Sequence, residues 1–347
     1  MIDILKFRVP IIQAPMAGGI TIPALVAAVA NTGAIGSFGF AYSNAQKINE
    51  DLIAAKTLTK NPINANFFIF SPVTLPNEHT QNEALSALNQ LPNSENISLR
   101  IPQPPFHLDL EEQLQPIWEH QPAMLTFHLG IPPQVVIQRA HSLDICVGIT
   151  ATNEKEALAI QKAGADFIVA QGIEAGGHRG HFDADDDSDE QHSTTELVTR
   201  LAAVSSLPIV AAGGIMDGED IRNILNHGAS AAQMGTAFLC CDEAGTSPTH
   251  KHFIMNEHDR ETVYTKGFSG RWAQGINNQF IKLMEKEPVL PFPIQNMLTN
   301  PVRQFAIKTN DGEYQSLWAG KSYKKARATP VRQLIQQLVD ELKLADL

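Results

Sequence analysis

Eight short apolar runs, each bounded by glycine, proline or polar turn residues, limit the fold of this sequence more than any other feature. A helical pattern follows seven of them, and an irregular segment follows the eighth. Runs that are apolar at nearly every position are typical of parallel strands covered on both faces, which need helical crossovers. The pattern therefore predicts an α/β fold, a (β/α)₈ TIM barrel. The runs are Val9–Gln13, Ala34–Phe38, Ile63–Ile69, Ala123–Leu129, Asp144–Thr150, Asp166–Gln171, Pro208–Ala212 and Ser230–Thr236.

Residues 77–121 lie between the third and fourth runs and are longer than one crossover needs. Within them, the prolines of Ile101–Phe106 exclude a central strand, because proline cannot donate a hydrogen bond to a sheet. We expect a helix followed by a loop excursion.

Residues 240–300 also depart from the strand and helix alternation, since they carry scattered aromatic residues, methionines and prolines. An amphipathic pattern returns at Val331–Leu344 and predicts the last helix. We therefore predict a barrel formed by residues 1–239 and 301–347. Residues 240–300 are expected to form a smaller, mostly helical insertion that covers the barrel mouth.

The formal net charge of −11 argues against proteins that work through a basic surface. Binding to nucleic acid or to an anionic membrane surface needs clustered lysine and arginine, so we expect neither partner. Part of the negative charge lies in an acidic run at residues 183–190. This run lacks the glycine and glutamate positions of a calcium loop and is interpreted as a solvated excursion.

The first ten residues show no signal-peptide pattern, and no stretch of eighteen apolar residues occurs. The three cysteines, Cys146, Cys240 and Cys241, are too few and too awkwardly spaced for a disulfide framework. These features predict a cytoplasmic protein. They leave open whether it is a monomer or a homodimer.

Glycines follow the last two predicted strands, at Gly213, Gly214 and Gly235. In TIM barrels a phosphate often lies beyond these strands, where glycines let backbone N–H groups approach an anion. The helix expected to begin after Asp217 adds its positive dipole end. The pattern favours a phosphorylated ligand, although glycines at these positions also serve tight turns.

A glycine-rich loop after the sixth strand, residues 172–181, follows Gln171 and contains His178. A histidine flanked by glycines, without apolar neighbours in the sequence, is not expected to be a packed core residue. We predict that it faces the barrel mouth with a near-neutral pKa suited to proton abstraction; a solvated loop histidine is the alternative. His178 and His181 lack a third ligand in phase, so we expect no metal.

Polar residues also occur at the ends of other strands. Asn66, inside the third strand, is placed either to bind the edge of a heterocycle or to join a structural network in the barrel. His128, at the end of the fourth strand, is placed to line the same cavity as a substrate-pocket residue. The segment Gln13–Gly19 follows the first strand.

Together these segments resemble the nitronate monooxygenases, formerly called 2-nitropropane dioxygenases, and in particular the class I members. The resemblance covers nearly the whole chain, and the loop from Glu174 to Gly180 is its most specific part. It rests on Gln13–Gly19, Ala65–Phe67, Gln171–Gly180, Ala212–Ile215, Gln233–Thr236, Phe268–Arg271 and Ser316–Gly320.

This resemblance implies that the phosphorylated ligand is FMN, bound without a covalent link, and that His178 is the catalytic residue. Asn66, Gln171 and Gly176 would contact the flavin or ribityl chain, while Gly214 and Gln233–Thr236 would hold the phosphate. The full set expected to bind the cofactor is Ala14, Pro15, Met16, Asn66, Gln171, Gly176, Gly177, Gly213, Gly214, Gln233, Met234, Gly235 and Thr236.

The resemblance also implies the reaction, oxidation of an alkyl nitronate such as propionate 3-nitronate by O₂ to a carbonyl compound and nitrite, without NAD(P)H. A nitronate is already a carbanion equivalent, so it can give an electron to a flavin directly. His178 would remove the α-proton of a neutral nitroalkane, or, when protonated, hold the nitronate anion. The family function implies a role in detoxification.

Other interpretations share these features. An FMN barrel that takes electrons from NAD(P)H, such as an enoyl-thioester or quinone reductase, would carry similar glycine loops. A barrel of the IMP dehydrogenase type needs a nucleophilic cysteine on a mid-barrel loop, whereas Cys146 lies within a predicted strand. A non-catalytic flavin carrier would not need a base at the mouth.

Overall fold

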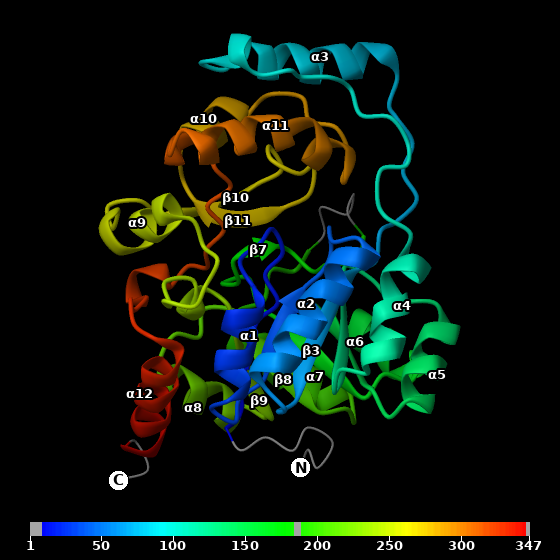
Figure 1. Ribbon diagram of the computed structural model, residues 1–347, viewed down its shortest axis with the longest axis vertical. Coiled ribbons are helices and arrows are strands. Elements are labelled where there is room, and N and C mark those ends of the chain that lie inside the picture. The colour runs from blue at the N-terminus through cyan, green and yellow to red at the C-terminus, as the bar shows by residue number, and fades with distance from the viewer. Residues whose placement is uncertain (1–8, 184–188, 345–347) are drawn as a thin grey trace.

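The computed structural model describes residues 9–183 and 189–344 and shows the predicted barrel (Figure 1). Eight parallel strands form one sheet in the order β1-β9-β8-β6-β5-β4-β3-β2. A bridge between Ile12 and Ile35 joins β1 to the β2 end of the sheet and closes the barrel. The strands are β1 (Ile11–Gln13), β2 (Gly36–Gly39), β3 (Ile63–Phe68), β4 (Met124–His128), β5 (Cys146–Ala151), β6 (Phe167–Gln171), β8 (Ile209–Ala212) and β9 (Ala231–Met234).

Helices surround the barrel and cover the outer face of its sheet (Figure 1). The main hydrophobic cluster lies between strands and helices, whereas a second, separate cluster that includes Ile12, Phe167 and Val210 fills the barrel interior. Two apolar layers explain why the strands are hydrophobic at nearly every position. The surrounding helices are α1 (Pro23–Ala30), α2 (Ala45–Leu58), α4 (Leu110–His120), α5 (Gln134–Ser142), α6 (Glu154–Ala163), α7 (Thr194–Val204), α8 (Gly218–Asn226) and α12 (Val331–Leu344).

Helix ends follow the local sequence. Asp217 caps α8, and its side chain accepts a hydrogen bond from the backbone N–H of Asp220. Gly33, Gly164 and Gly228 follow helices with φ of 93°, 84° and 106°, a left-handed conformation in which glycine carries no steric penalty. These turns return each helix to the next strand.

A second unit lies above the barrel mouth (Figure 1). It contains α9 (Pro248–Asn256), β10 (Thr262–Thr265), β11 (Ala273–Ile276), α10 (Gln279–Met284) and α11 (Ile294–Lys308), with short 3₁₀ turns at Thr236–Phe238, Gly312–Tyr314 and Tyr323–Lys325. The strands form a three-stranded antiparallel sheet with β7 (Gly177–His178), a pairing that the sequence did not predict.

The long excursion contributes to this second unit. It contains α3 (Glu78–Asn89), a 3₁₀ turn at Ser94–Asn96 and then extended chain through the proline segment, as expected. Residues Ala84 and Leu88 of α3 pack in one hydrophobic cluster with Phe280 and Leu298 of the second unit. Figure 1 shows α3 lying over α10 and α11. The predicted domain boundaries stay a prediction, and this packing adds residues from the excursion to the cover.

Within the described residues, no helix is both long and apolar enough to cross a membrane. The three cysteines are free and buried. Burial raises the pKa of each thiol, to about 11 for Cys240 and about 12 for Cys241. Thiols with raised pKa values are poor nucleophiles at neutral pH.

Candidate active site

A cavity of about 900 Å³ lies at the carboxyl ends of the barrel strands, beneath the second unit. It is at the upper end of the range of roughly 300–1,000 Å³ for small-molecule sites. Every site residue predicted from the sequence lines it. These residues are Ala14, Pro15, Met16, Asn66, His128, Gln171, Gly176, Gly177, His178, Gly213, Gly214, Gln233, Met234, Gly235 and Thr236.

One side of the cavity is a glycine rim, formed by Gly213, Gly214 and Gly235 at the ends of β8 and β9. Gly213 and Gly214 have φ of 127° and 70°, and a Cβ on Gly213 would lie 2.6 Å from Thr194 Oγ1. Among the described residues, the backbone N–H groups of Gly214, Ile215, Gly235 and Thr236 have no hydrogen-bond acceptor. Converging free N–H groups near the start of α8 form a site suited to a phosphate group.

The loop that carries His178 is fixed by side chains of two barrel strands. Gln171 Nε2 donates to the His178 carbonyl oxygen at 3.0 Å, and Gln171 Oε1 accepts from the Gly180 N–H at 2.6 Å. His128 Nε2 donates to the same carbonyl at 3.1 Å. Gln171 and His128 thus line the cavity and also position the backbone of residue 178.

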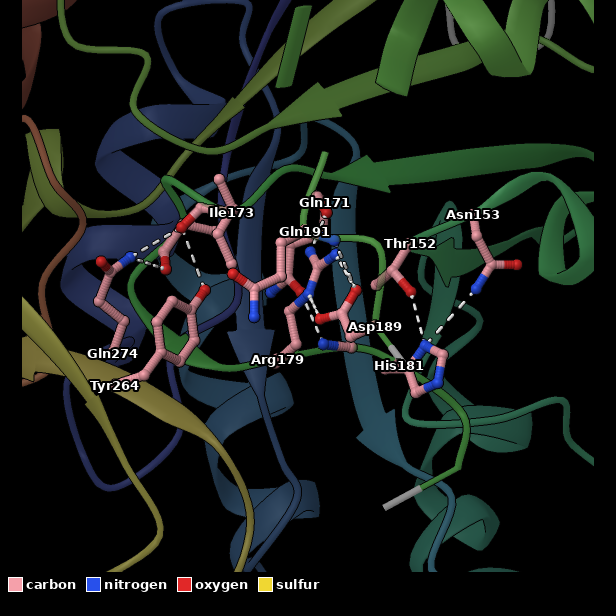
Figure 2. Close-up of polar contacts among 12 residues, drawn as sticks. Thr152, Asn153, Gln171, Ile173, Arg179, His181, Asp189, Gln191, Tyr264 and Gln274 are labelled. Carbon is pink, nitrogen blue, oxygen red and sulfur yellow. Dashed lines mark hydrogen bonds and ion pairs between the residues drawn. The ribbon is translucent and has the colours of Figure 1, made fainter. Parts of the chain in front are cut away.

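The same loop is held to the second unit (Figure 2). In strand β7, Gly177 and His178 pair with Gln274 and Ala273 of β11. The side chains of Gln274 and Tyr264 each donate to the Ile173 carbonyl oxygen at 3.1 Å. The loop that carries His178 therefore bridges the barrel and its cover.

The acidic run contributes to this arrangement through one residue, Asp189, whereas Asp183 and Glu190 are exposed, as expected for a solvated excursion. Asp189 accepts hydrogen bonds from Arg179 Nε at 2.6 Å and Nη2 at 2.8 Å (Figure 2). Arg179 is buried and also donates to the Gln171 carbonyl oxygen. Arg179 holds the pKa of Asp189 below its usual value, against the opposing effect of burial. Residues 184–188 of the run lie outside the described residues.

Aromatic rings surround the imidazole of His178. We call this set, Phe68, Phe292 and Trp318, the aromatic wall; their ring centroids lie 5.7, 5.4 and 5.9 Å from that of His178. His178 Nε2 is buried and has no hydrogen-bond partner among the described residues. His178 lines the cavity and is partly buried, as expected, but its neighbours in the sequence did not indicate these rings, which come from segments distant along the chain.

The environment also corrects the expected near-neutral pKa. Burial lowers the pKa of His178 to about 3, and the positive charges of Arg271 and Arg303 act in the same direction. Burial likewise lowers the pKa of His128 to about 4. Both imidazoles are therefore neutral at pH 7, and a protonated His178 does not supply a cation to the cavity.

Asn66 belongs to a polar network inside the barrel mouth. Its Nδ2 donates to Thr126 Oγ1 at 3.0 Å, and Thr126 also bonds to Asn64. Asn64 reaches Ser37 Oγ at 3.2 Å. Both interpretations of Asn66 remain open, because it joins this network and also lines the cavity.

His181 does not join His178 at the cavity. Its Nδ1 lies 3.1 Å from Thr152 Oγ1 and 3.3 Å from Glu156 Oε1, away from the cavity lining. Among the described residues, another group with metal-ligand atoms is Glu154, Glu190 and His192. Arg200 contacts both of these glutamates, at 2.6 and 3.5 Å, so its guanidinium already supplies a cation there.

Several cavity residues were missed by sequence reasoning. Tyr42, Trp318 and Arg303 all line the cavity. Tyr42 follows β2, Trp318 lies outside the named helices and strands, and Arg303 lies within α11. Trp318 falls in the segment Ser316–Gly320 that carries part of the family resemblance, which is a signal that could have found it. No comparable signal marks Arg303.

The chain was compared with known proteins. The sequence profile of the family described as nitronate monooxygenase matches residues 1–341. A probable nitronate monooxygenase from Staphylococcus aureus (strain MSSA476) is 36% identical over 346 residues, covering 98% of this chain and 96% of the relative. A protein with the same description from Staphylococcus haemolyticus (strain JCSC1435) is 35% identical, covering 98% of this chain and 95% of the relative.

Solved structures are also similar to this chain. A nitroalkane oxidase from Streptomyces ansochromogenes superposes with a TM-score of 0.93 at 33% identity, covering 98% of this chain and 97% of that one. FabK from Thermotoga maritima superposes with a TM-score of 0.77 at 23% identity, covering 99% and 96%. The second likeness shows a shared fold.

Proposed function

The chain belongs to the nitronate monooxygenase family, and from this premise we propose that it binds FMN without a covalent bond and oxidises alkyl nitronates. O₂ would be the oxidant, and a carbonyl compound and nitrite the products, with no need for NAD(P)H. The observation that carries the proposal is one cavity joining a glycine rim suited to a phosphate with an enclosed, neutral imidazole. Propionate 3-nitronate is one candidate substrate.

The donor set of the cavity fits FMN. The free N–H groups at Gly214, Ile215, Gly235 and Thr236 would hold its phosphate, since backbone donors at a helix start suit a doubly charged anion. Ala14, Pro15 and Met16 would flank the ring system, with Asn66, Gln171, Gly176 and Gly177 along the other edges. When bound, the flavin supplies an acceptor for one electron from the nitronate and a route to O₂.

His178 would serve as the base when the substrate is a neutral nitroalkane. Its Nε2 has no hydrogen-bond partner among the described residues and can accept an α-proton, while Gln171 and His128 fix the backbone of residue 178. The aromatic wall limits water around this proton transfer. A pKa of about 3 makes the imidazolium unfavourable, so the site favours a nitronate, which arrives already deprotonated.

The experiment is anaerobic and aerobic mixing of the yellow, purified protein with ethyl nitronate. We expect spectral reduction of bound flavin without O₂, and O₂ consumption with nitrite release in air. NADH and NADPH, mixed anaerobically, should leave the flavin spectrum unchanged. Bleaching by either nicotinamide, together with inertness toward ethyl nitronate, would instead support an NAD(P)H-dependent reductase. A yellow protein inert to all three reagents would support a flavin carrier.

A further inference from the structure

The guanidinium of Arg303 lies at the cavity, and none of the described residues provides it with a counter-ion. Arg303 belongs to α11 in the second unit and lines the cavity. Its Nη2 donates to the backbone and side-chain oxygens of Asn296, at 2.5 and 2.9 Å. Its Nε is buried and has no acceptor among the described residues, and none of their carboxylates forms an ion pair with it. Burial lowers the pKa of this guanidinium.

An enclosed cation without a partner is unfavourable, because desolvation is not offset by an opposite charge. Arg271, the other arginine that acts on His178, is differently placed. It donates to the carbonyl oxygens of Arg179 and His181 and does not line the cavity. Since His178 and His128 are neutral at pH 7, Arg303 is a permanent positive charge at this part of the cavity.

Tyr42 provides a second donor beside this charge. Its side chain is 41% exposed, lines the cavity and interacts electrostatically with Arg303. Its hydroxyl has no hydrogen-bond partner among the described residues. The ordinary pKa of a phenol, about 10, keeps the proton on this hydroxyl at neutral pH. A guanidinium and a phenol, both with donors to spare, form a site for an anion.

We propose that Arg303, assisted by Tyr42, binds the planar two-oxygen anion of the substrate. This inference rests on the proposed function and adds the residue that recognises the charge of the substrate. Nitronates and carboxylates share the required chemistry, since in each a planar group carries two oxygens and one negative charge. The fork of an arginine fits such a group with two parallel hydrogen bonds.

The FMN phosphate is a different anion with its own donors. The glycine rim and the start of α8 would hold it at the ends of β8 and β9. The electrostatic contacts of Arg303 are instead with Tyr42, after β2, and His178, after β6. Arg303 is therefore assigned to the substrate and not to the cofactor.

Binding is tested with the FMN-loaded protein and two unreactive probes, succinate and propionate. Succinate has the shape and both charges of propionate 3-nitronate, whereas propionate has one charge. Arg303→Met should raise the Kd for succinate, read from the flavin absorbance, by about 10- to 100-fold, the size expected for loss of a charged hydrogen bond. Arg303→Lys should be intermediate, and Tyr42→Phe should raise it by about fivefold.

Lys308→Met is the matched control, because Lys308 is an exposed cation on the same helix. It should leave the Kd within about twofold, as exposed charges are strongly screened. Bound FMN should be equal in all variants, and the unfolding temperature should not fall in any of them. An unchanged Kd in Arg303→Met overturns the proposal. Loss of FMN from that variant also overturns it, since Arg303 would then belong to the cofactor site.

A kinetic comparison identifies which anion Arg303 holds. Propyl 1-nitronate replaces the carboxylate of propionate 3-nitronate by a methyl group. A fall in kcat/KM of Arg303→Met for both substrates means that the guanidinium binds the nitronate, and a fall confined to propionate 3-nitronate means that it binds the carboxylate. Equal kcat/KM for parent and variant with both substrates overturns the proposal. If the parent protein oxidises neither, the proposed function fails, while the succinate titration still tests the anion site.

Discussion

The glycine rim and the aromatic wall bound the same cavity, but they are built in opposite ways. The rim uses backbone N–H groups at strand ends, and its residues are glycines, which have no side chain beyond a hydrogen atom. The wall uses large side chains that come from β3, from the segment before α11 and from the segment after it. The barrel therefore supplies backbone donors suited to an anion, whereas two rings of the cover, together with Phe68, make the surroundings of His178 apolar.

The largest effect should follow a change in the rim. Gly213→Ala places a Cβ at a φ of 127° and 2.6 Å from Thr194 Oγ1. We expect loss of about 2–4 kcal/mol in the free energy of unfolding and at least about a 100-fold weaker affinity for FMN. Denaturant unfolding and flavin release measure the two quantities.

Gly164→Ala is the control for this change. Gly164 also has a positive φ, of 84°, but open space surrounds its Cβ position and it lies away from the cavity. It should lower stability by about 1 kcal/mol and leave FMN affinity unchanged. Equal FMN affinity in Gly213→Ala and the parent would show that the rim does not hold the phosphate.

The second effect tests the group that the wall encloses. His178→Asn should keep FMN bound, because the backbone of residue 178 is fixed by Gln171 and His128. Turnover of nitroethane should fall by about 100-fold or more, the usual contribution of a general base. Turnover of ethyl nitronate should fall less, since it needs no proton removal. Nitroethane turnover at the parent rate would show that His178 is not the base.

The third effect should follow the removal of one ring from the aromatic wall. Phe292→Ala should let water reach the imidazole and raise the pKa of His178 from about 3 toward its usual 6.5. More of the variant is then protonated at pH 5, so its kcat/KM for nitroethane should fall about tenfold between pH 7.5 and pH 5 relative to the parent.

Phe70→Ala is the matched control for Phe292→Ala. The Phe70 ring stacks on Phe292 at 5.4 Å and forms no ring contact with His178. Its pH profile should follow that of the parent. Parallel profiles for Phe292→Ala and the parent would mean that the wall does not control the pKa of the base.

The smallest effect concerns the cover as a barrier to solvent. His250, on α9, is buried, and burial lowers its pKa to about 4. Between pH 6.5 and 4 the unfolded chain binds a proton there that the folded chain does not, so stability falls as pH falls through this window. The free energy of unfolding of the parent should decrease between pH 7 and pH 5. In His250→Gln this decrease should be smaller by up to about 2 kcal/mol, measured by denaturant unfolding.

His79→Gln, at an exposed histidine of α3, is the control and should keep the full pH dependence of the parent. If His250→Gln also keeps the full pH dependence of the parent, His250 is not shielded from water and the cover is not a barrier to solvent at α9.

The barrel and the positions of its site residues could be predicted from the sequence because each depends on local patterns. Continuous apolar runs identify strands covered on both faces, and glycines at Gly33, Gly164 and Gly228 mark the ends of helices. The carboxyl ends of parallel strands meet at one edge. Gly213 and Gln171 therefore had to lie near one another, and both line the cavity.

The rest could not be predicted because it depends on contacts between distant segments. The glycines beside His178 suggested an open, solvated loop, yet Phe292 and Trp318 enclose its ring from more than 100 residues along the chain. The acidic run suggested a solvated surface, but Asp189 pairs with a buried arginine. Arg303 lies on α11, and the sequence of that helix does not indicate which of its residues face the cavity. Such features appear when the cover folds over the barrel.

The pairing of β7 with β11 joins the barrel and its cover at His178, the proposed base. The same short strand is anchored to the barrel through Gln171 and His128. A hinge that lifted the cover at this edge would break one set of these bonds and displace the imidazole. We therefore expect ligands to enter and leave on another side of the cover, which would keep the imidazole of His178 in place.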